Sequence, residues 1–112
     1  DIMHISPSHH FPTGMVMPIS KRYELLGWVT REKERYIIED DYDSELRLAG
    51  KPIPSLQSID VSGKVIYINT FAKTLCSTVR ISYMVLPEAL AENFHFIPVP
   101  CLILNSIHWQ HL

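Results

Sequence analysis

Hydrophobic positions in this chain gather into short apolar runs, separated by polar or proline-containing stretches, which is typical of buried strands joined by loops. Near-continuous apolar runs predict strands over residues 36–39, 64–69 and 79–86. A looser alternation predicts another strand over residues 1–6, closed by Pro7. Strands that are apolar throughout favour a mixed or parallel sheet covered on both faces.

A helical period lies between the first two of these strands. Ser20 suits the N-cap of a helix that runs to about Glu34, with Tyr23 and Leu26 on its apolar side. Charged residues are expected on the opposite side of this helix, namely Lys21, Arg22, Glu24, Arg31, Glu32, Lys33 and Glu34. We expect one short helical turn over residues 55–59. A further helix is expected over residues 88–94, with Pro87 in its first turn. The order of elements predicts an α/β layered fold.

Two polar stretches are expected to be loops. Residues 7–14 hold two prolines and a glycine, and residues 40–54 are polar with Gly50, Pro52 and Pro54. Long loops that follow strands often carry function. Residues 95–112 differ from the rest, because they are nearly free of charge and keep neither a helical nor a strand period.

Composition narrows the class of protein. The chain has 112 residues, 46% of them hydrophobic and 20% charged, which suits one globular domain at most. The net charge is −2 and no basic residues cluster, so the sequence shows no electrostatic signature of DNA or RNA binding. No apolar run approaches the ~20 residues needed to cross a bilayer. Cys76 and Cys101 do not show the spacing of a disulfide framework, which favours a reducing, cytoplasmic setting. Because the chain begins with Asp1, we expect a piece of something longer.

The candidate chemistry lies where predicted strands end. Asp40 and Tyr42 follow the strand at 36–39, and Thr70 and Lys73 follow the strand at 64–69, with Arg80 further along. Pyridoxal phosphate (PLP) needs a lysine amine for its aldehyde, an acid for its ring nitrogen, and a cation with hydroxyls for its phosphate. These residue types therefore predict a PLP site, in which Tyr42 contacts the phenolic oxygen of the ring.

Each of these residues has a simpler interpretation. Lys73 alone would most often be a surface lysine, Arg80 a structural arginine, and Tyr42 an aromatic lid on the core. The acidic cluster around Asp40 would suit solvent or a divalent metal, although it lacks the spacing of a calcium loop. The histidine pairs at 9–10 and at 108 and 111 lack a convincing set of further metal ligands, so no metal site is predicted.

At these residues the chain resembles the aminotransferase-like domain of the MocR/GabR-type regulators, a branch of the GntR transcription-factor family. The matching segments are residues 7–14, 36–45 and 65–87, and the resemblance covers about residues 1–94. It implies an α/β fold, part of the large domain of a fold type I PLP-dependent aminotransferase, with a mostly parallel sheet flanked by helices. It also implies that Lys73 is the Schiff-base lysine, Asp40 the partner of the pyridine nitrogen, and Tyr42 a contact of the ring oxygen. Thr70 and Arg80 match phosphate contacts.

The resemblance further implies that residues 1–94 are an incomplete PLP-binding domain and that residues 95–112 are a divergent tail of unknown structure. Phe11 stands where many aminotransferases carry an asparagine, which fits the regulators better than the enzymes. His10 and Ala72 differ from the family's usual Gln and Ser. The complete regulator would bind DNA through an N-terminal winged helix, sense an amino compound and form a homodimer. A fragment of a genuine aminotransferase, or an inactive gene remnant, remain alternatives.

Overall fold

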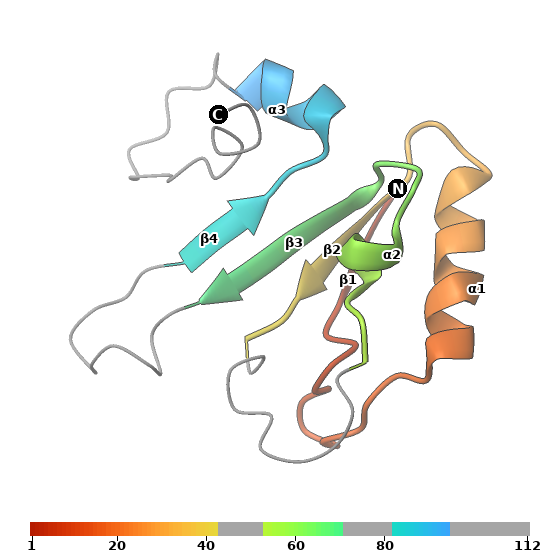
Figure 1. The fold of residues 1–112 in the computed structure, drawn as a ribbon, viewed down its shortest axis with the longest axis vertical. Coiled ribbons are helices and arrows are strands. Elements are labelled where there is room, and N and C mark those ends of the chain that lie inside the picture. Colours follow the sequence, from red (N-terminus) through yellow and green to blue (C-terminus); the bar gives the residue numbers. More distant parts are fainter. Residues whose placement is uncertain (43–52, 71–81, 95–112) are drawn as a thin grey trace.

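A computed structural model of the chain describes residues 1–42, 53–70 and 82–94. Its centre is a four-stranded sheet in the order β1-β2-β3-β4 (Figure 1). The strands are β1 (Ile2–Ile5), β2 (Tyr36–Asp40), β3 (Val65–Thr70) and β4 (Ser82–Val85). The first three strands are parallel, and β4 runs antiparallel to β3. The carboxyl ends of β1, β2 and β3 therefore meet at one edge of the sheet.

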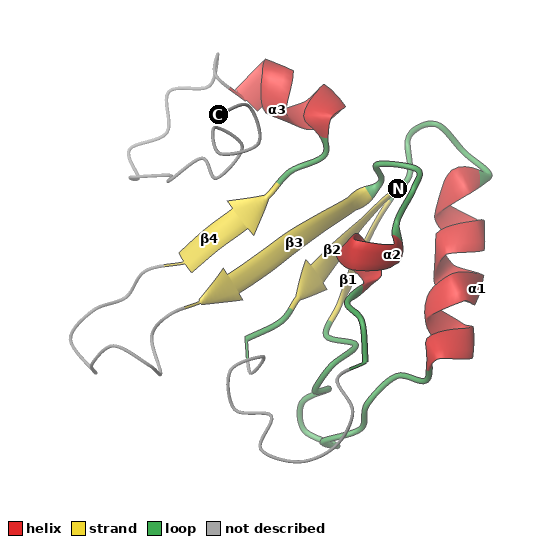
Figure 2. Ribbon diagram, in the orientation of Figure 1, coloured by secondary structure: helices red, strands yellow, loops and turns green. Residues whose placement is uncertain are grey.

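In the described part of the chain, three helices accompany the sheet, namely α1 (Ile19–Thr30), α2 (Leu56–Ile59) and α3 (Glu88–Phe94) (Figure 2). Figure 1 shows α1 on the β1 side of the sheet and α3 on the β4 side. Because β1 and β2 are parallel, the chain must cross over between them, and α1 makes this crossover. Val29 of α1, Ile37, Leu56 of α2 and Val65 form the buried core. None of the described helices is long and apolar enough to span a membrane.

The two faces of the sheet differ in character, because successive side chains of a strand point to opposite sides. One side, which we call the helix face, carries the buried residues Ile37 and Glu39 of β2 and packs against the helical core residues. The other side, which we call the second face, carries half-buried residues. Its members are Ile38, Asp40, Ile66, Ile68 and Met84, as the strand registers place them.

The α/β class and the mixed sheet predicted from the sequence are confirmed, since the described elements follow the expected order. Strand ends at residues 36–40 and 65–70 lie within a residue of the prediction. Of the strand expected at 79–86, the structure has Ser82–Val85, and residues 79–81 lie outside the described part.

The predicted ends of the first helix are wrong. Pro18 is the N-cap in place of Ser20, because its extended backbone lets its carbonyl oxygen accept from the amides of Lys21 and Arg22. The helix ends at Thr30 rather than near Glu34. There the amide of Arg31 turns to the carbonyl of Trp28, and the Arg35 guanidinium also donates to that carbonyl, at 3.2 Å.

Candidate functional site

Two of the predicted site residues lie together at the carboxyl edge of the parallel strands. Asp40 is the last residue of β2 and Thr70 the last residue of β3. Asp40 pairs in register with Ile68, so Thr70, two residues further along β3, shares its face of the sheet. In open α/β sheets, ligands bind in the crevice outside the carboxyl ends of the strands. Both residues therefore stand where a ligand site of this fold class is expected.

The side chain of Asp40 remains 31% exposed on the second face, so it is accessible to a ligand. Its Oδ2 lies 3.4 Å from Nε2 of His4 on the neighbouring strand β1. The register explains the approach, because His4 stands opposite Ile38, and Ile38 and Asp40 share a face. His4 itself is 61% exposed at its side chain.

The opposite side of the same edge holds a hydrogen-bond network. The Tyr67 hydroxyl donates to Oδ2 of Asp41 at 2.8 Å, and the Asn69 amide donates to the hydroxyls of Tyr67 and Tyr83 at 3.2 Å each. Burial and the hydrogen bond to Asp41 raise the pKa of the Tyr67 hydroxyl. Oδ1 of Asn69 accepts from the amide of Thr70 at 2.7 Å, so the network fixes the backbone at Thr70.

A second network joins the loops that surround the edge, and it contradicts one prediction. Arg22, expected on the charged side of α1, has no exposed surface. Its guanidinium donates to the carbonyls of Met17, Pro54 and Pro7 at 3.1, 2.9 and 3.0 Å. It also lies 3.9 Å from Glu39, which is equally buried. The two charges are paired because a buried guanidinium without acceptors would be costly.

Glu39 connects this pair to α2. Its Oε1 and Oε2 accept from the amides of Leu56 and Gln57, both at 2.9 Å. Burial raises the pKa of Glu39, against the lowering effect of these amides and of Arg22. The carboxylate thus satisfies the first amides of a short helix, which have no partner within it.

Tyr42 faces the loop at residues 7–14. Its hydroxyl donates to the carbonyl of His9 at 2.9 Å, and its ring stacks on the His9 ring with centroids 5.8 Å apart. This contact fastens the loop after β1 to the turn after β2. A tyrosine in this position contacts a ring oxygen only if its hydroxyl leaves the His9 carbonyl.

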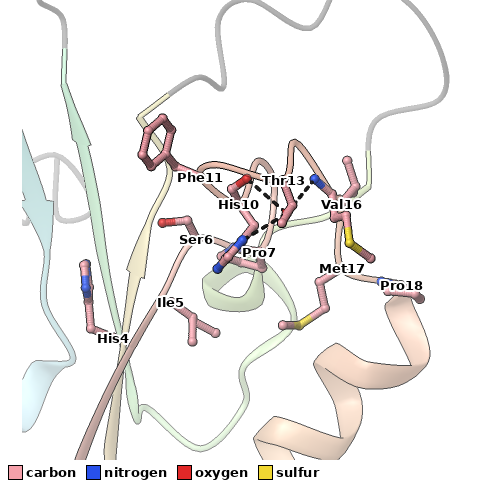
Figure 3. Close-up of a pocket in the computed structure, with 11 residues that line it drawn as sticks. His4, Ile5, Ser6, Pro7, His10, Phe11, Thr13, Val16, Met17 and Pro18 are labelled. Carbon is pink, nitrogen blue, oxygen red and sulfur yellow. Dashed lines mark hydrogen bonds between the residues drawn. The ribbon is translucent and has the colours of Figure 1, made fainter.

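This loop and the residues on either side of it line an open, mostly apolar pocket of about 560 Å³ (Figure 3). Within it, Nδ1 of His10 and Oγ1 of Thr13 lie 3.0 Å apart, and the amide of Met15 donates to the same oxygen at 3.4 Å. The Phe11–Pro12 peptide bond is cis, and Phe11 points outward with 81% of its surface exposed. The pocket is lined by His4, Ile5, Ser6, Pro7, His10, Phe11, Thr13, Met15, Val16, Met17 and Pro18.

The predicted site residues therefore have three outcomes. Asp40 and Thr70 share a face and an edge, and Tyr42 lies nearby with its hydroxyl turned to His9. Lys73 and Arg80 lie outside the described residues. An accessible carboxylate and a threonine at a strand end fit the ring nitrogen and the phosphate of PLP, so Asp40 and Thr70 suit this cofactor.

Sequence reasoning missed three residues around this edge, namely His4, Arg22 and Glu39. His4 was detectable in principle, since strand alternation and a parallel register place it beside Asp40. Burial of Arg22 was not, because its carbonyl acceptors come from loops distant in sequence.

Known proteins resemble this chain in sequence and in fold. It is 50% identical over 91 residues to the uncharacterized HTH-type transcriptional regulator YhdI of Bacillus subtilis, covering 81% of this chain and 19% of that protein. It is 43% identical over 111 residues to the probable rhizopine catabolism regulatory protein MocR of Rhizobium meliloti, covering 99% of this chain and 21% of that protein. The chain thus spans about a fifth of the length of these relatives. No protein-family profile matches it.

Among solved structures, the chain matches a kynurenine aminotransferase of Pyrococcus horikoshii, in complex with PMP, with a TM-score of 0.75. The two are 30% identical, and the match covers 82% of this chain and 22% of that one. The sheet edge that carries Asp40 and Thr70 thus belongs to a fold found in aminotransferases. The chain is homologous to a segment of the MocR-type HTH transcriptional regulators, and its fold is that of the corresponding part of the fold type I aminotransferases.

Proposed function

We propose that the chain is part of the PLP-binding, aminotransferase-like effector domain of a MocR-type transcriptional regulator. The observation that carries this proposal is the placement of Asp40 and Thr70 on one face, at the carboxyl edge of the parallel strands. Homology to regulators that are named as HTH-type supports the regulatory role.

Each site residue has a task in this proposal. Asp40 accepts the hydrogen bond of a protonated ring nitrogen, and Thr70 and Arg80 bind the phosphate. Lys73 holds the cofactor covalently through its amine. When bound, PLP supplies an aldehyde that reacts with amines and a ring that withdraws electrons. Tyr42 reaches the ring oxygen after exchanging the His9 carbonyl for it.

The complete protein would use this site to sense an amino compound. Its reaction with the cofactor would change the conformation of the domain, and this change would alter DNA binding by an N-terminal winged helix. We propose that the complete protein is a homodimer, since this fold type usually builds its site across two subunits. We also propose that it acts in the cytoplasm.

The first prediction tests cofactor capture at Lys73. Incubation of the 112-residue chain with PLP, followed by borohydride reduction and peptide mapping, should place most of the label on the peptide that contains Lys73. Binding should be weak and transamination absent, because a tight site needs a complete and rigid shell. Lys73→Ala should lose this label, whereas Lys21→Ala, which removes an exposed lysine, should keep it. Label spread evenly over all lysines would contradict the proposal and favour an inactive remnant.

A second candidate function is a genuine aminotransferase, which the fold match to a kynurenine aminotransferase favours. Lys73 would then also move a proton between the substrate and the cofactor. Fold alone does not decide between enzyme and regulator. The whole protein that carries this chain would have to turn over an amino acid and a keto acid repeatedly. Bound PLP without such turnover would exclude the enzyme.

A further inference from the structure

We infer that His4 is a positioning residue for Asp40, an inference that rests on the proposed PLP site. The observation is the 3.4 Å separation between Nε2 of His4 and Oδ2 of Asp40 on the second face of the sheet. Among the described residues, His4 has the one basic side chain recorded within 4 Å of the Asp40 carboxylate.

The two oxygens of the Asp40 carboxylate have different neighbours. His4 approaches Oδ2 from β1, which lies on one side of β2. Thr70 stands on β3, on the other side of β2. With Oδ2 directed toward His4, Oδ1 is left for a ring nitrogen that enters from the carboxyl edge. A carboxylate accepts at both oxygens, so the two contacts do not exclude each other.

His4 also orients the carboxylate of Asp40, because its ring nitrogen lies next to one of the two oxygens. The hydrogen bond from a ring nitrogen to the other oxygen depends on that orientation. In the free chain this pair is worth little, because His4 is 61% exposed and water screens it. Its effect belongs to the bound state, where the cofactor excludes water from the carboxylate.

The exposure of His4 makes the inference testable without unfolding the protein. His4→Phe keeps a ring on the strand but removes the nitrogen that faces Asp40. His4→Gln keeps an amide donor at a similar reach and serves as the conservative variant. Both should leave the thermal transition close to that of the unaltered protein, since substitutions at exposed positions away from structural networks have small effects.

The experiment measures PLP affinity, by fluorescence titration, in the whole polypeptide that carries these 112 residues. His4→Phe should weaken binding by about five- to tenfold, in line with loss of one partly exposed polar contact to the carboxylate, and His4→Gln should recover most of the affinity. The absorbance maximum of the bound cofactor should shift in His4→Phe in the same direction as in Asp40→Asn. A purely structural role would not produce that shift.

The outcomes separate this inference from the proposed function. If the unaltered protein binds PLP at Lys73 but His4→Phe matches it in affinity and absorbance, the inference is wrong and the proposed function stands. If His4→Phe weakens binding equally in the presence and absence of Asp40→Asn, His4 does not act through Asp40, and the inference is again wrong. If the unaltered protein captures no more PLP than Lys73→Ala does, the proposed PLP site and the role of His4 are both overturned.

Discussion

Three consecutive acidic residues meet three different environments at the end of β2. Glu39 is buried on the helix face and holds the amides that open α2. Asp40 is half-exposed on the second face, and Asp41 is buried again beside the Tyr67 hydroxyl. Strand alternation therefore separates one carboxylate for ligand chemistry from two neighbours that serve the structure.

The Arg22–Glu39 pair supports a prediction about stability. Arg22→Met should destabilise the chain by about 3–5 kcal/mol, because it leaves a buried carboxylate without its cation and three carbonyls without their donor. Lys21→Met is the matched control, since Lys21 lies in an exposed pair with Glu24 and its loss should cost under about 1 kcal/mol. Urea denaturation of both variants measures the difference. Equal losses in the two variants would show that the Arg22 network contributes no special stability.

The pH dependence of this loss has a definite sign. Burial raises the pKa of Glu39 above its ordinary 4.5, so its charge costs stability as the pH rises from that value through the folded-state pKa. Arg22 lowers that pKa, and its removal raises it further. The deficit of Arg22→Met should therefore be larger at neutral pH than below the ordinary pKa of the carboxyl group.

At the scale of elements, two glycines have opposite roles. Gly27 lies within α1, exposed, and a Cβ built on it meets nothing within 4 Å. Gly63 has a φ of 65° in the turn before β3, where Asp60 accepts from the amides of Ser62, Lys64 and Val65. Gly27 thus only loosens its helix, whereas Gly63 permits a left-handed turn.

Alanine at each glycine should shift stability in opposite directions. Gly27→Ala should stabilise the chain by about 0.5–1 kcal/mol, because alanine loses less backbone entropy in a helix. Gly63→Ala should destabilise it by about 1–2 kcal/mol, because the left-handed conformation strains a residue with a Cβ. The midpoints of thermal unfolding test both. A gain at Gly63 would refute the assigned role of the turn.

The elements also show what the sequence could and could not predict. Near-continuous apolar runs identified β2, β3 and β4, and a looser alternation of apolar and polar residues identified β1. The start of α1 was missed because the Pro18 carbonyl, which no side-chain signal marks, takes the role expected of the Ser20 hydroxyl. At the site, Asp40 and Thr70 follow from strand ends, whereas the partners His4 and Arg22 depend on strand register and on distant loops.

At the scale of the whole molecule, the second face of the sheet is an apolar surface that is only partly covered. Ile38, Ile66, Ile68 and Met84 are only half-buried, and the strand registers place them next to one another. Contiguous exposed apolar surface attracts hydrophobic dyes and other chains.

This surface predicts dye binding by the folded chain. Anilinonaphthalene sulfonate should fluoresce with the 112-residue chain, and the double variant Ile38→Thr with Ile68→Thr should lower the signal, because threonine keeps the strand but reduces the apolar area. Val61→Thr, at a fully exposed turn residue, is the control and should leave the signal unchanged. Absence of dye fluorescence in the unaltered chain, with a sharp thermal transition, would show that this face is covered.

The single guanidinium of Arg22, shared by the carbonyls of Pro7, Met17 and Pro54, limits how the loops of this domain can evolve. Surface loops ordinarily tolerate insertions and deletions, because their ends are held by the elements they connect. Here a change of length next to any of the three carbonyls moves an acceptor away from a buried cation. The segment between β1 and α1, which holds Pro7 and Met17, and the segment before α2, which holds Pro54, therefore have to keep their lengths together. Nothing in the linear sequence links these two segments.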